Sequence, residues 1–580
     1  MKTNSYKSIG IICLAGLISL LMSFSQHRWT RLQIIQQDAR IYYEILPATF
    51  VHGDPTFQFL EQPNFTQRHE YWLESDSSHN GRFMKYTIGV GLVQAPVYLL
   101  VNGVCELVGI DHPPFGKADH FAVFLATWLA YLGALIGSFR VLRHYFSDGV
   151  TSLVLLAVFL ATNVFHYTCF SPGYGHIYSL LALSWLWYVS IRLQETQRPR
   201  LFFALGLIFG LIILIRPTNA VMALIPLAVI AGKRERGSLV SFWRQHLSGI
   251  SLALAGVFCI VFPQLLLWKF STGSWLVYSY GKESFFWSKP HLIEGLFSFR
   301  NGWLSYAPVM IGLFPGLILL RKADKMLFWA LLLFLLVNNY VIYSWWCWWY
   351  GGAYGSRPQV DSALITGFLL GVALNHVWNH RQIRSICALL VVCFASINLF
   401  QSYQASIGIL HWDSMTAKSY RDIFLTLKPN EWYEYHLKQP DYENAVRGRE
   451  YPVLVDQEIT PKAGLLDTTN TFSPGIELDL DSIQAQQVST FYLSGVFQWK
   501  EIPTRDVFMV FNTLDSAGNS ISYQSWSMHN PNFEVNRRYV IKKQVNWDKT
   551  IHPVGSKLRV YVWNPDKCQF FMDAYRLSNF

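Results

Sequence analysis

A single acid follows the first apolar run of the chain in a setting suited to proton transfer. Asp38 stands in the sequence Gln-Asp-Ala-Arg-Ile-Tyr-Tyr-Glu, together with Tyr42, Tyr43 and Glu44. A partly desolvated carboxylate beside a membrane can accept a proton from the hydroxyl group of a sugar or a protein. The alternative is a solvated loop aspartate with no catalytic role.

An arginine lies between two further apolar runs, where Arg216 directly precedes Pro217. Placing an arginine near bilayer depth costs at least ~2.5 kcal/mol on insertion scales, and a functional role is one explanation of that cost. Proline breaks the helix there and frees backbone groups, which is typical of a cavity. A fixed cation in such a cavity suits a phosphate. The alternative is an arginine that reaches the interface from a short hairpin.

Two predicted outer loops, 270–302 and 344–359, are rich in aromatic residues. They contribute the candidates Glu283, Arg300, Trp349, Tyr350 and Arg357. Aromatic residues at a membrane edge form an interfacial belt in the first place. Here four Trp stand with several Gly and an arginine, which is more than a belt requires. Aromatic faces pack on sugar rings and lipid chains, glycines allow close backbone approach, and Arg357 can clamp a phosphate.

One histidine completes the set of candidates. His176 enters a predicted span after Phe-Ser-Pro-Gly-Tyr-Gly, where it can bind substrate or shuttle a proton. An interfacial histidine without such a role is the alternative. No P-loop, dinucleotide fingerprint or zinc-protease motif occurs, so no cofactor is predicted. No cluster of acidic ligands is visible, and we predict no metal.

These residues must be positioned by membrane helices. Hydrophobic residues make up 52% of the 580 residues and charged residues only 14%, which argues against a soluble enzyme. Runs of about 17–25 apolar residues can span a bilayer. The predicted spans, about eleven, lie near 8–24, 119–140, 150–166, 177–193, 201–216, 219–232, 249–269, 303–320, 326–343, 360–378 and 385–401. The apolar segment 86–110, which contains Gly89, Gly91 and Pro96, is either a twelfth span or an interfacial helix.

The distribution of basic residues sets the orientation. If 86–110 is interfacial and the N terminus is cytoplasmic, every short inner turn is basic, as the positive-inside rule requires. These turns hold Arg140/Arg143, Arg192/Arg198/Arg200, Lys233/Arg234/Arg236, Arg321/Lys322/Lys325 and Arg381/Arg384. The net charge of +10 is then explained by cytoplasmic loops and not by nucleic acid. The C terminus is predicted to lie outside.

The C-terminal part has a different pattern. We divide the chain into a membrane domain at 1–401, a helical or mixed connector at 402–470 and an all-β domain at 471–580. Alternating strands are expected at 489–498, 506–511, 520–526, 539–545, 557–563 and 569–577. Such short strands with turn residues between them indicate a sandwich. The last strand resembles the closing strand of carbohydrate-binding jelly rolls, so the domain either binds glycan or serves as a structural cap.

The membrane part resembles the C-type glycosyltransferases that use polyprenyl-phosphate sugars. These include the protein O-mannosyltransferases and the lipid A aminoarabinose transferases. The resemblance covers about residues 8–400. It rests on the motif of Asp38 with Tyr42-Tyr43, the segment 86–110, Gly206–Gly210 leading into Arg216-Pro-Thr, and Trp-Tyr-Gly-Gly-Ala-Tyr-Gly-Ser-Arg ending at Arg357. The stretch from Pro263 to Asp361 is similar to uncharacterised bacterial members.

The resemblance implies an inverting sugar transfer on the outer, periplasmic face of a bacterial inner membrane. Asp38 would deprotonate the acceptor hydroxyl, which would attack the anomeric carbon. Arg216, with Arg357 or Arg300, would hold the departing polyprenyl phosphate. Substrate contacts would come from Tyr42, Tyr43, His176, Glu283, Trp349 and Tyr350. The mannosyltransferases carry an Asp-Glu pair, whereas Ala39 follows Asp38 here. The resemblance therefore does not decide whether the acceptor is a protein. If a second acid takes part, the candidates are Glu44, Asp54 and Glu283.

Two other function classes stay open at this point. A transporter or flippase of lipid-linked glycans should show paired broken helices or an inverted repeat, and only one break, at Arg216-Pro217, is visible. A non-catalytic scaffold that presents the sandwich would not need Asp38 and Arg216 at one membrane face. The expected partners are the bilayer, a polyprenyl-phosphate sugar and a glycan, lipid or protein acceptor, without nucleic acid.

Overall fold

The computed structural model divides the chain into two compact units, Met1–Gly408 and Ile409–Phe580, described separately here as unit 1 and unit 2. The structure describes residues 5–54, 56–61, 73–76, 81–231, 247–440, 442–448, 456–459, 465–466, 471–481, 490–501, 506–528, 533–546, 554–565 and 567–578.

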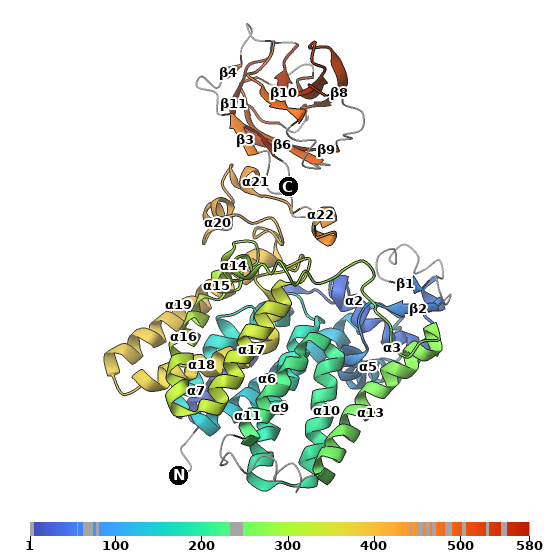
Figure 1. The fold of residues 1–580 in the computed structure, drawn as a ribbon, viewed down its shortest axis with the longest axis vertical. Coiled ribbons are helices and arrows are strands. Elements are labelled where there is room, and N and C mark those ends of the chain that lie inside the picture. Colours follow the sequence, from blue (N-terminus) through green and yellow to red (C-terminus); the bar gives the residue numbers. More distant parts are fainter. Residues whose placement is uncertain are drawn as a thin grey trace. The chain divides into compact units, whose positions relative to one another are not determined.

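Unit 1 is helical (Figure 1). Its longer helices are α1 (Tyr6–Gln26), α5 (Gly89–Val108), α6 (Lys117–Tyr145), α7 (Asp148–Leu160), α9 (Gly175–Thr196), α10 (Pro199–Ile215), α11 (Leu224–Ala231), α13 (Leu247–Thr272), α16 (Leu313–Ala323), α17 (Lys325–Tyr343), α18 (Ala363–Val377) and α19 (Arg381–Ser406). Shorter elements include α2 (Gln37–Tyr43), α8 (Val164–Cys169), α15 (Trp303–Tyr306), and the 3-10 helices η3 (Pro217–Ala223), η4 (Pro308–Gly312) and η5 (Arg357–Ser362).

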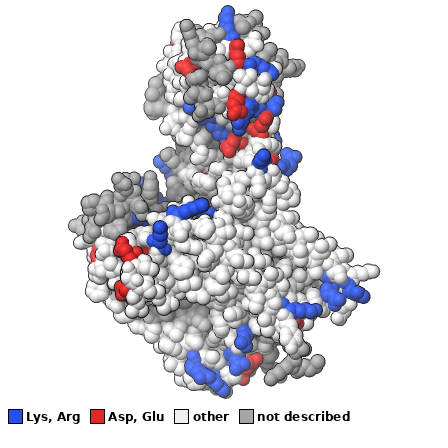
Figure 2. Space-filling view, turned by 180° about the vertical axis from the view of Figure 1, so that it is seen from behind, with Lys and Arg blue, Asp and Glu red and all other residues white. Residues whose placement is uncertain are grey.

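Among the described residues, seven helical segments are long and apolar enough to cross a membrane. They are Tyr6–Gln26, Gly89–Val108, Lys117–Tyr145, Leu247–Thr272, Lys325–Tyr343, Arg357–Val377 and Arg381–Ser406. Three shorter apolar helices join them, so the chain is a multi-pass membrane protein, and the number of spans stays a prediction. Figure 2 shows a broad surface of unit 1 without Lys, Arg, Asp or Glu, which fits a lipid-facing band.

Every expected span contains helical structure among its described residues, with three differences in detail. The segment 150–166 is interrupted at residues 161–163, between α7 and α8. The segment 303–320 is interrupted, because Pro308 lacks the N–H that would continue α15 into η4 and α16. The segment 86–110, expected in the interface, contains α5, which has the length and composition of a span. The positive-inside argument that placed it in the interface is therefore not decisive.

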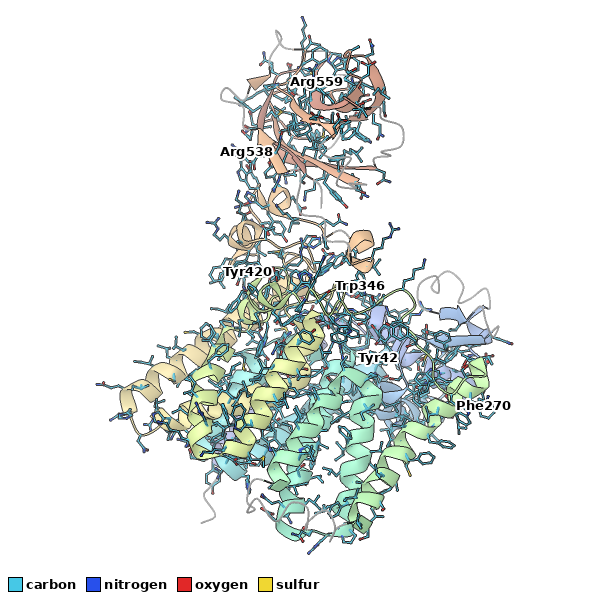
Figure 3. All side chains as sticks on the ribbon, viewed as in Figure 1. Tyr42, Phe270, Trp346, Tyr420, Arg538 and Arg559 are labelled. Carbon is cyan, nitrogen blue, oxygen red and sulfur yellow. The ribbon has the colours of Figure 1, made fainter. Side chains whose placement is uncertain are left out.

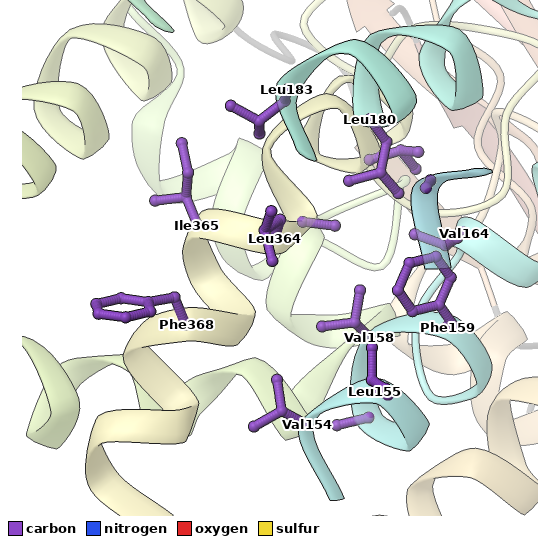
Figure 4. Packing of buried hydrophobic residues seen from close by; sticks show 14 of the residues in the cluster. Val154, Leu155, Val158, Phe159, Val164, Leu180, Leu183, Leu364, Ile365 and Phe368 are labelled. Carbon is purple, nitrogen blue, oxygen red and sulfur yellow. The ribbon is translucent and has the colours of Figure 1, made fainter. Parts of the chain in front are cut away.

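The core of unit 1 is built where α7, α8, α9 and α18 meet (Figure 4). Val158 and Phe159 of α7, Leu180 of α9, and Leu364 and Ile365 of α18 are all 1% exposed or less. Close packing of such side chains fixes the relative positions of helix ends. The residues at the ends of α9 and before α18 thereby become fixed neighbours.

Small residues allow α10 and α13 to touch along their backbones. A Cβ atom on Gly206 would lie 1.9 Å from the Ala253 carbonyl oxygen, and one on Gly256 would lie 2.5 Å from the Phe203 carbonyl oxygen. Membrane helices that lack a hydrophobic drive to associate use such small-residue contacts. The end of α10, where Arg216 stands, is thus held by close helix packing.

Unit 2 contains two antiparallel sheets that enclose one apolar core. One sheet has the order β5-β10-β7-β8 and the other β3-β11-β6-β9, with β4 also paired to β11. The strands are β3 (Asp456–Ile459), β4 (Leu465–Leu466), β5 (Ile476–Asp479), β6 (Thr490–Trp499), β7 (Phe508–Leu514), β8 (Ser520–Ser527), β9 (Arg538–Asn546), β10 (Lys557–Trp563) and β11 (Phe570–Ser578). With β3 and β4 as the first strand, this is the order of a jelly roll, which confirms the expected sandwich.

The sandwich begins earlier than the expected boundary at residue 471. The strands β3 and β4 pair with β11 in the five-stranded sheet, although they lie in the segment that we assigned to the connector. Both are short, four and two residues, so their alternation is too brief to be recognised in the sequence. The short helices α20 (Ala417–Ile423), α21 (Tyr433–His436) and α22 (Tyr442–Val446) precede them.

Candidate active site

The carboxylate of Asp38 pairs with a fixed guanidinium group. Asp38 lies in the first turn of α2, and its Oδ2 is 3.1 Å from Nη2 of Arg357, the first residue of η5. The Arg357 guanidinium carbon lies 5.4 Å from the ring centre of Tyr174 and 5.8 Å from that of Tyr350. The two side chains are 14% and 12% exposed, so the pair is partly accessible. This places an acid and a cation together at one accessible point.

The second arginine belongs to a more deeply buried network. The Arg216 Nε lies 3.3 Å from Oδ2 of Asp361, and the other Asp361 oxygen lies 2.7 Å from Nδ1 of His176. Asn219 donates to Oδ2 of Asp361 at 3.0 Å. Since Asp361 and His176 are only 3% and 2% exposed while Arg216 is 20% exposed, the arginine is the member of this network nearest to solvent.

Local sequence explains why Arg216 leaves its helix. Its φ of −151° and ψ of 110° are extended, so α10 ends at Ile215. Pro217 imposes this, because the residue before a proline is excluded from the helical region. The chain then turns through η3, where the Asn219 N–H donates to the Arg216 carbonyl at 2.9 Å. The guanidinium therefore projects from a helix end and not along its side.

Tyr42 lies within electrostatic range of members of both arginine clusters. Asp38 and Tyr42 are four residues apart on α2 and share one face of that helix. Tyr42 stacks on Tyr86 with ring centres 4.6 Å apart. Burial raises the pKa of Tyr42, which also interacts electrostatically with Arg216 and Asp38. Figure 3 shows Tyr42 at the end of unit 1 where Trp346 also lies.

Glycines bring these elements into contact. A Cβ on Gly89, at the start of α5, would lie 2.5 Å from the Ile215 backbone nitrogen, one residue before Arg216. A Cβ on Gly175 would lie 2.9 Å from the Tyr42 hydroxyl oxygen. Any larger residue would push α5 from the end of α10 or α9 from α2. The site therefore depends on backbone approach as well as on polar groups.

A third ion pair borders the site. Glu283 accepts from Lys85 and, at 3.1 Å, from the indole N–H of Trp346. Lys85 also lies 5.6 Å from the ring centre of Tyr280. Burial raises the pKa of Tyr280 to about 12 although Arg216 opposes the shift, so its phenol stays protonated and can donate a hydrogen bond at neutral pH. Tyr280 links Glu283 electrostatically to the main site.

Two sequence-predicted residues, Tyr43 and Arg300, have their described contacts with other residues. Tyr43 donates to Asp119 and packs edge-on against Phe115, away from the Asp38 face of α2. Arg300 lies over the ring of Trp349, with its guanidinium carbon 5.7 Å from the ring centre. Tyr350 contacts Arg357 and donates to the Ile342 carbonyl at 2.8 Å.

Sequence reasoning missed several members of the site. Asp361, Asn219, Tyr174 and Lys85 received no role. The signal for Asp361 was available: an acid at the start of an apolar span is costly without a partner. The others carry no comparable signal, because polar residues in loops are ordinary. Among the described residues no group of three or more His, Cys, Asp or Glu could hold a metal ion.

Comparison with known proteins gives one match to a family model. Residues 115–268 match the model described as dolichyl-phosphate-mannose-protein mannosyltransferase. The expected resemblance to membrane glycosyltransferases that use polyprenyl-phosphate sugars is thereby confirmed for this stretch. The match includes His176, Arg216 and Asn219 but neither Asp38 nor Arg357. A comparison with curated protein sequences gives no match.

Two solved structures align with a large part of this chain. ArnT from Cupriavidus metallidurans, in its apo state, is 15% identical, with 69% of this chain and 69% of that chain covered and a TM-score of 0.41. The apo oligosaccharyltransferase from Archaeoglobus fulgidus is 12% identical, with 75% of this chain and 60% of that chain covered and a TM-score of 0.41. This chain thus spans less than two thirds of the archaeal enzyme.

Proposed function

We propose that this chain is a membrane glycosyltransferase that transfers a sugar with inversion of configuration at the anomeric carbon. Residues 115–268 are similar to the dolichyl-phosphate-mannose-protein mannosyltransferases. The donor is a sugar linked to a polyprenyl phosphate, and the acceptor is a hydroxyl group on the periplasmic face of a bacterial inner membrane. The observation that carries the proposal is the pairing of Asp38 with Arg357, with Arg216 within electrostatic range of Tyr42 on the same helix as Asp38.

The chemistry needs a base and a stabilised leaving group on opposite sides of one anomeric carbon. The acceptor oxygen attacks that carbon as its proton moves to Asp38, and the bond between the carbon and the phosphate oxygen breaks. The electron pair leaves with the polyprenyl phosphate. Arginine is suited to this phosphate, because its planar fork binds two oxygens and its charge is permanent. Arg216 meets this need, since its counter-ion Asp361 holds it from the buried side.

Arg357 has a double role in this scheme. Without donor it pairs with Asp38 at 3.1 Å. An arriving phosphate competes with the carboxylate for the same guanidinium, so donor binding loosens Asp38 and leaves it able to accept a proton. Without a bound donor, the Asp38 carboxylate would then stay paired with Arg357 and would not act as a base. The rings of Tyr174 and Tyr350 keep the Arg357 guanidinium in place during the exchange.

The test is binding and turnover of a labelled donor panel. Purified protein in nanodiscs is mixed with radiolabelled polyprenyl-phosphate sugars, and retained label is measured with and without acceptor lipid or glycan extracts. We expect one donor to bind and its label to move to an acceptor. Arg216→Gln should weaken donor binding about tenfold or more, from the loss of a charged hydrogen bond. Arg384→Gln is the matched control, because Arg384 lies over Trp378 and outside the site.

The outcomes separate the function classes. Donor that binds but is never consumed, and instead crosses the membrane of sealed vesicles, would favour a transporter of lipid-linked glycans. No binding of any donor would contradict the proposal. Equal loss in Arg216→Gln and Arg384→Gln would show that the effect is not specific to the site.

A further inference from the structure

Unit 2 has a polar pocket of about 310 Å³ on its five-stranded sheet. One wall is the segment around α21, whose Tyr435 packs on Val496 and Ala574. The floor consists of outward-facing residues of β6, β9 and β11. Its lining includes Glu434, Lys438, Tyr492, Ser494, Lys542 and Arg576.

Strand register brings two cations to either side of a small residue. Arg576 of β11 lies opposite Ser494 of β6, and Ser494 lies opposite Lys542 of β9. Cross-strand neighbours have Cβ atoms about 5 Å apart, so the two cations begin about 10 Å apart across one serine. Their long side chains can converge above Ser494, because serine leaves that space open. The arrangement forms a notch with a positive group on each side.

The next row of the same face supplies an aromatic ring and polar groups. Tyr492 stands two residues before Ser494 on β6, with Ser578 and Gln544 opposite it on the neighbouring strands. An aromatic face packs on the apolar side of a sugar ring, while amides and hydroxyls bind the sugar hydroxyls. The Tyr492 ring, on which a sugar could pack, therefore stands two residues along β6 from the notch at Ser494.

The charge balance of the pocket favours an anion. Three basic residues of its outward side line it, Lys438, Lys542 and Arg576, against one acid, Glu434, which interacts electrostatically with Lys542. Glu458 of β3 is the cross-strand neighbour of Arg576, so a second acid borders the outer side of that arginine. The basic excess remains. On the other sheet, Lys557 and Arg559 both pair with Glu477, at 3.0 and 2.8 Å.

We infer that this pocket binds an acidic saccharide. The carboxylate or phosphate substituent lies between Arg576 and Lys542 above Ser494, and the sugar ring packs against Tyr492. The inference does not depend on the proposed transfer reaction. It would give unit 2 a ligand of its own, a charged glycan of the cell envelope, whichever donor unit 1 uses.

Binding is tested with the full chain in nanodiscs of neutral lipid, by surface plasmon resonance. The probes are pairs that differ in charge alone or nearly so: tetragalacturonate and its methyl ester, sialyllactose and lactose, and mannose 6-phosphate and mannose. We expect at least one acidic member to bind tenfold or more tightly than its neutral counterpart, and added salt to weaken that binding. If no acidic member exceeds its counterpart, the inference is wrong.

Variants locate the bound probe. Lys542→Gln should weaken binding about tenfold through loss of a charged hydrogen bond, and Ser494→Leu should abolish it by filling the notch at unchanged charge. The matched controls, Lys557→Gln and Ser525→Leu, lie on the other sheet and should bind as the natural protein does. Lys542 is exposed on its strand, so its variant tests the site even if Ser494→Leu fails to fold. Equal losses in Lys542→Gln and Lys557→Gln, or equal binding of a tetraglutamate peptide, would overturn the inference.

Discussion

Two Arg-Pro turns meet at the candidate active site, and they use the same sequence in different ways. Arg216-Pro217 and Arg357-Pro358 each lead into a 3-10 helix that continues into an α-helix. Arg357 holds Asp38, which is 14% exposed, whereas Arg216 is held by Asp361, which is 3% exposed. The first acid can meet a substrate and the second cannot. In our proposal, therefore, Asp38 is the carboxylate that reacts, and Asp361 positions Arg216.

The largest expected effect is a loss of stability when the buried acid Asp361 is replaced. Asp361→Asn removes the counter-ion of Arg216 and leaves the buried side chains of His176 and Asn219 without an anionic partner. Breaking a buried ion pair costs about 3–5 kcal/mol, and we expect about 3 because Arg216 is partly exposed. SDS unfolding in mixed micelles measures the free energy of unfolding. Asp324→Asn is the control, since asparagine also caps the start of α17. A loss below about 1 kcal/mol would remove the distinction between the two acids.

The second largest effect is expected when the proline of either Arg-Pro turn is replaced. Pro217→Ala lifts the restriction on Arg216 and allows α10 to continue through it, which moves the guanidinium. A displacement of about 1 Å can cost up to about 100-fold in rate. We therefore expect transfer to fall roughly 10- to 100-fold, measured with labelled donor. Pro358→Ala should cost less, because two rings hold the Arg357 side chain. The reverse order would mean that the backbone, and not the rings, fixes Arg357.

Much of this architecture follows from sequence pattern. Long apolar runs and alternating strands are repeated signals, so the helices of unit 1 and the strands β6 to β11 could be placed within a few residues. The spacing of Asp38 and Tyr42 is also readable, since residues four apart share a helix face. The same rule separates Tyr43 from Asp38, and applying it would have removed Tyr43 from the candidates.

The remaining features depend on tertiary contacts. That Asp361 reaches Arg216 follows from the packing of α9 against η5, which joins segments far apart in the sequence. No local pattern encodes such a pairing. The strands β3 and β4 also depend on a tertiary contact, because they become strands only by pairing with β11. The sequence-predicted boundary at 471 consequently cuts through a sheet.

A smaller effect is expected at the accessible pair. Arg357→Gln should lower the free energy of unfolding by about 1–2 kcal/mol, less than Asp361→Asn, because the Asp38 side chain that remains is 14% exposed and water can reach it. The same unfolding measurement applies, with Arg384→Gln as the control. A loss as large as that of Asp361→Asn would show that both acids are structural.

The smallest effect is predicted for the arginine outside both turns. Arg300 contacts the Trp349 ring, a cation–π interaction worth about 0.5–1 kcal/mol where exposed. Arg300→Gln should therefore change donor affinity by less than about fivefold in the same binding assay. A loss comparable to that of Arg216→Gln would restore Arg300 as a phosphate ligand.

The most direct test of the whole account compares binding with chemistry in one variant. Asp38→Asn keeps the shape of the side chain but removes the base, so donor binding and unfolding should change little while single-turnover sugar transfer falls about 10²- to 10⁴-fold. Asp54→Asn, which changes another acid near α2, should transfer sugar normally. Transfer by Asp38→Asn at a rate close to that of the natural protein would contradict the assignment of Asp38 as the base.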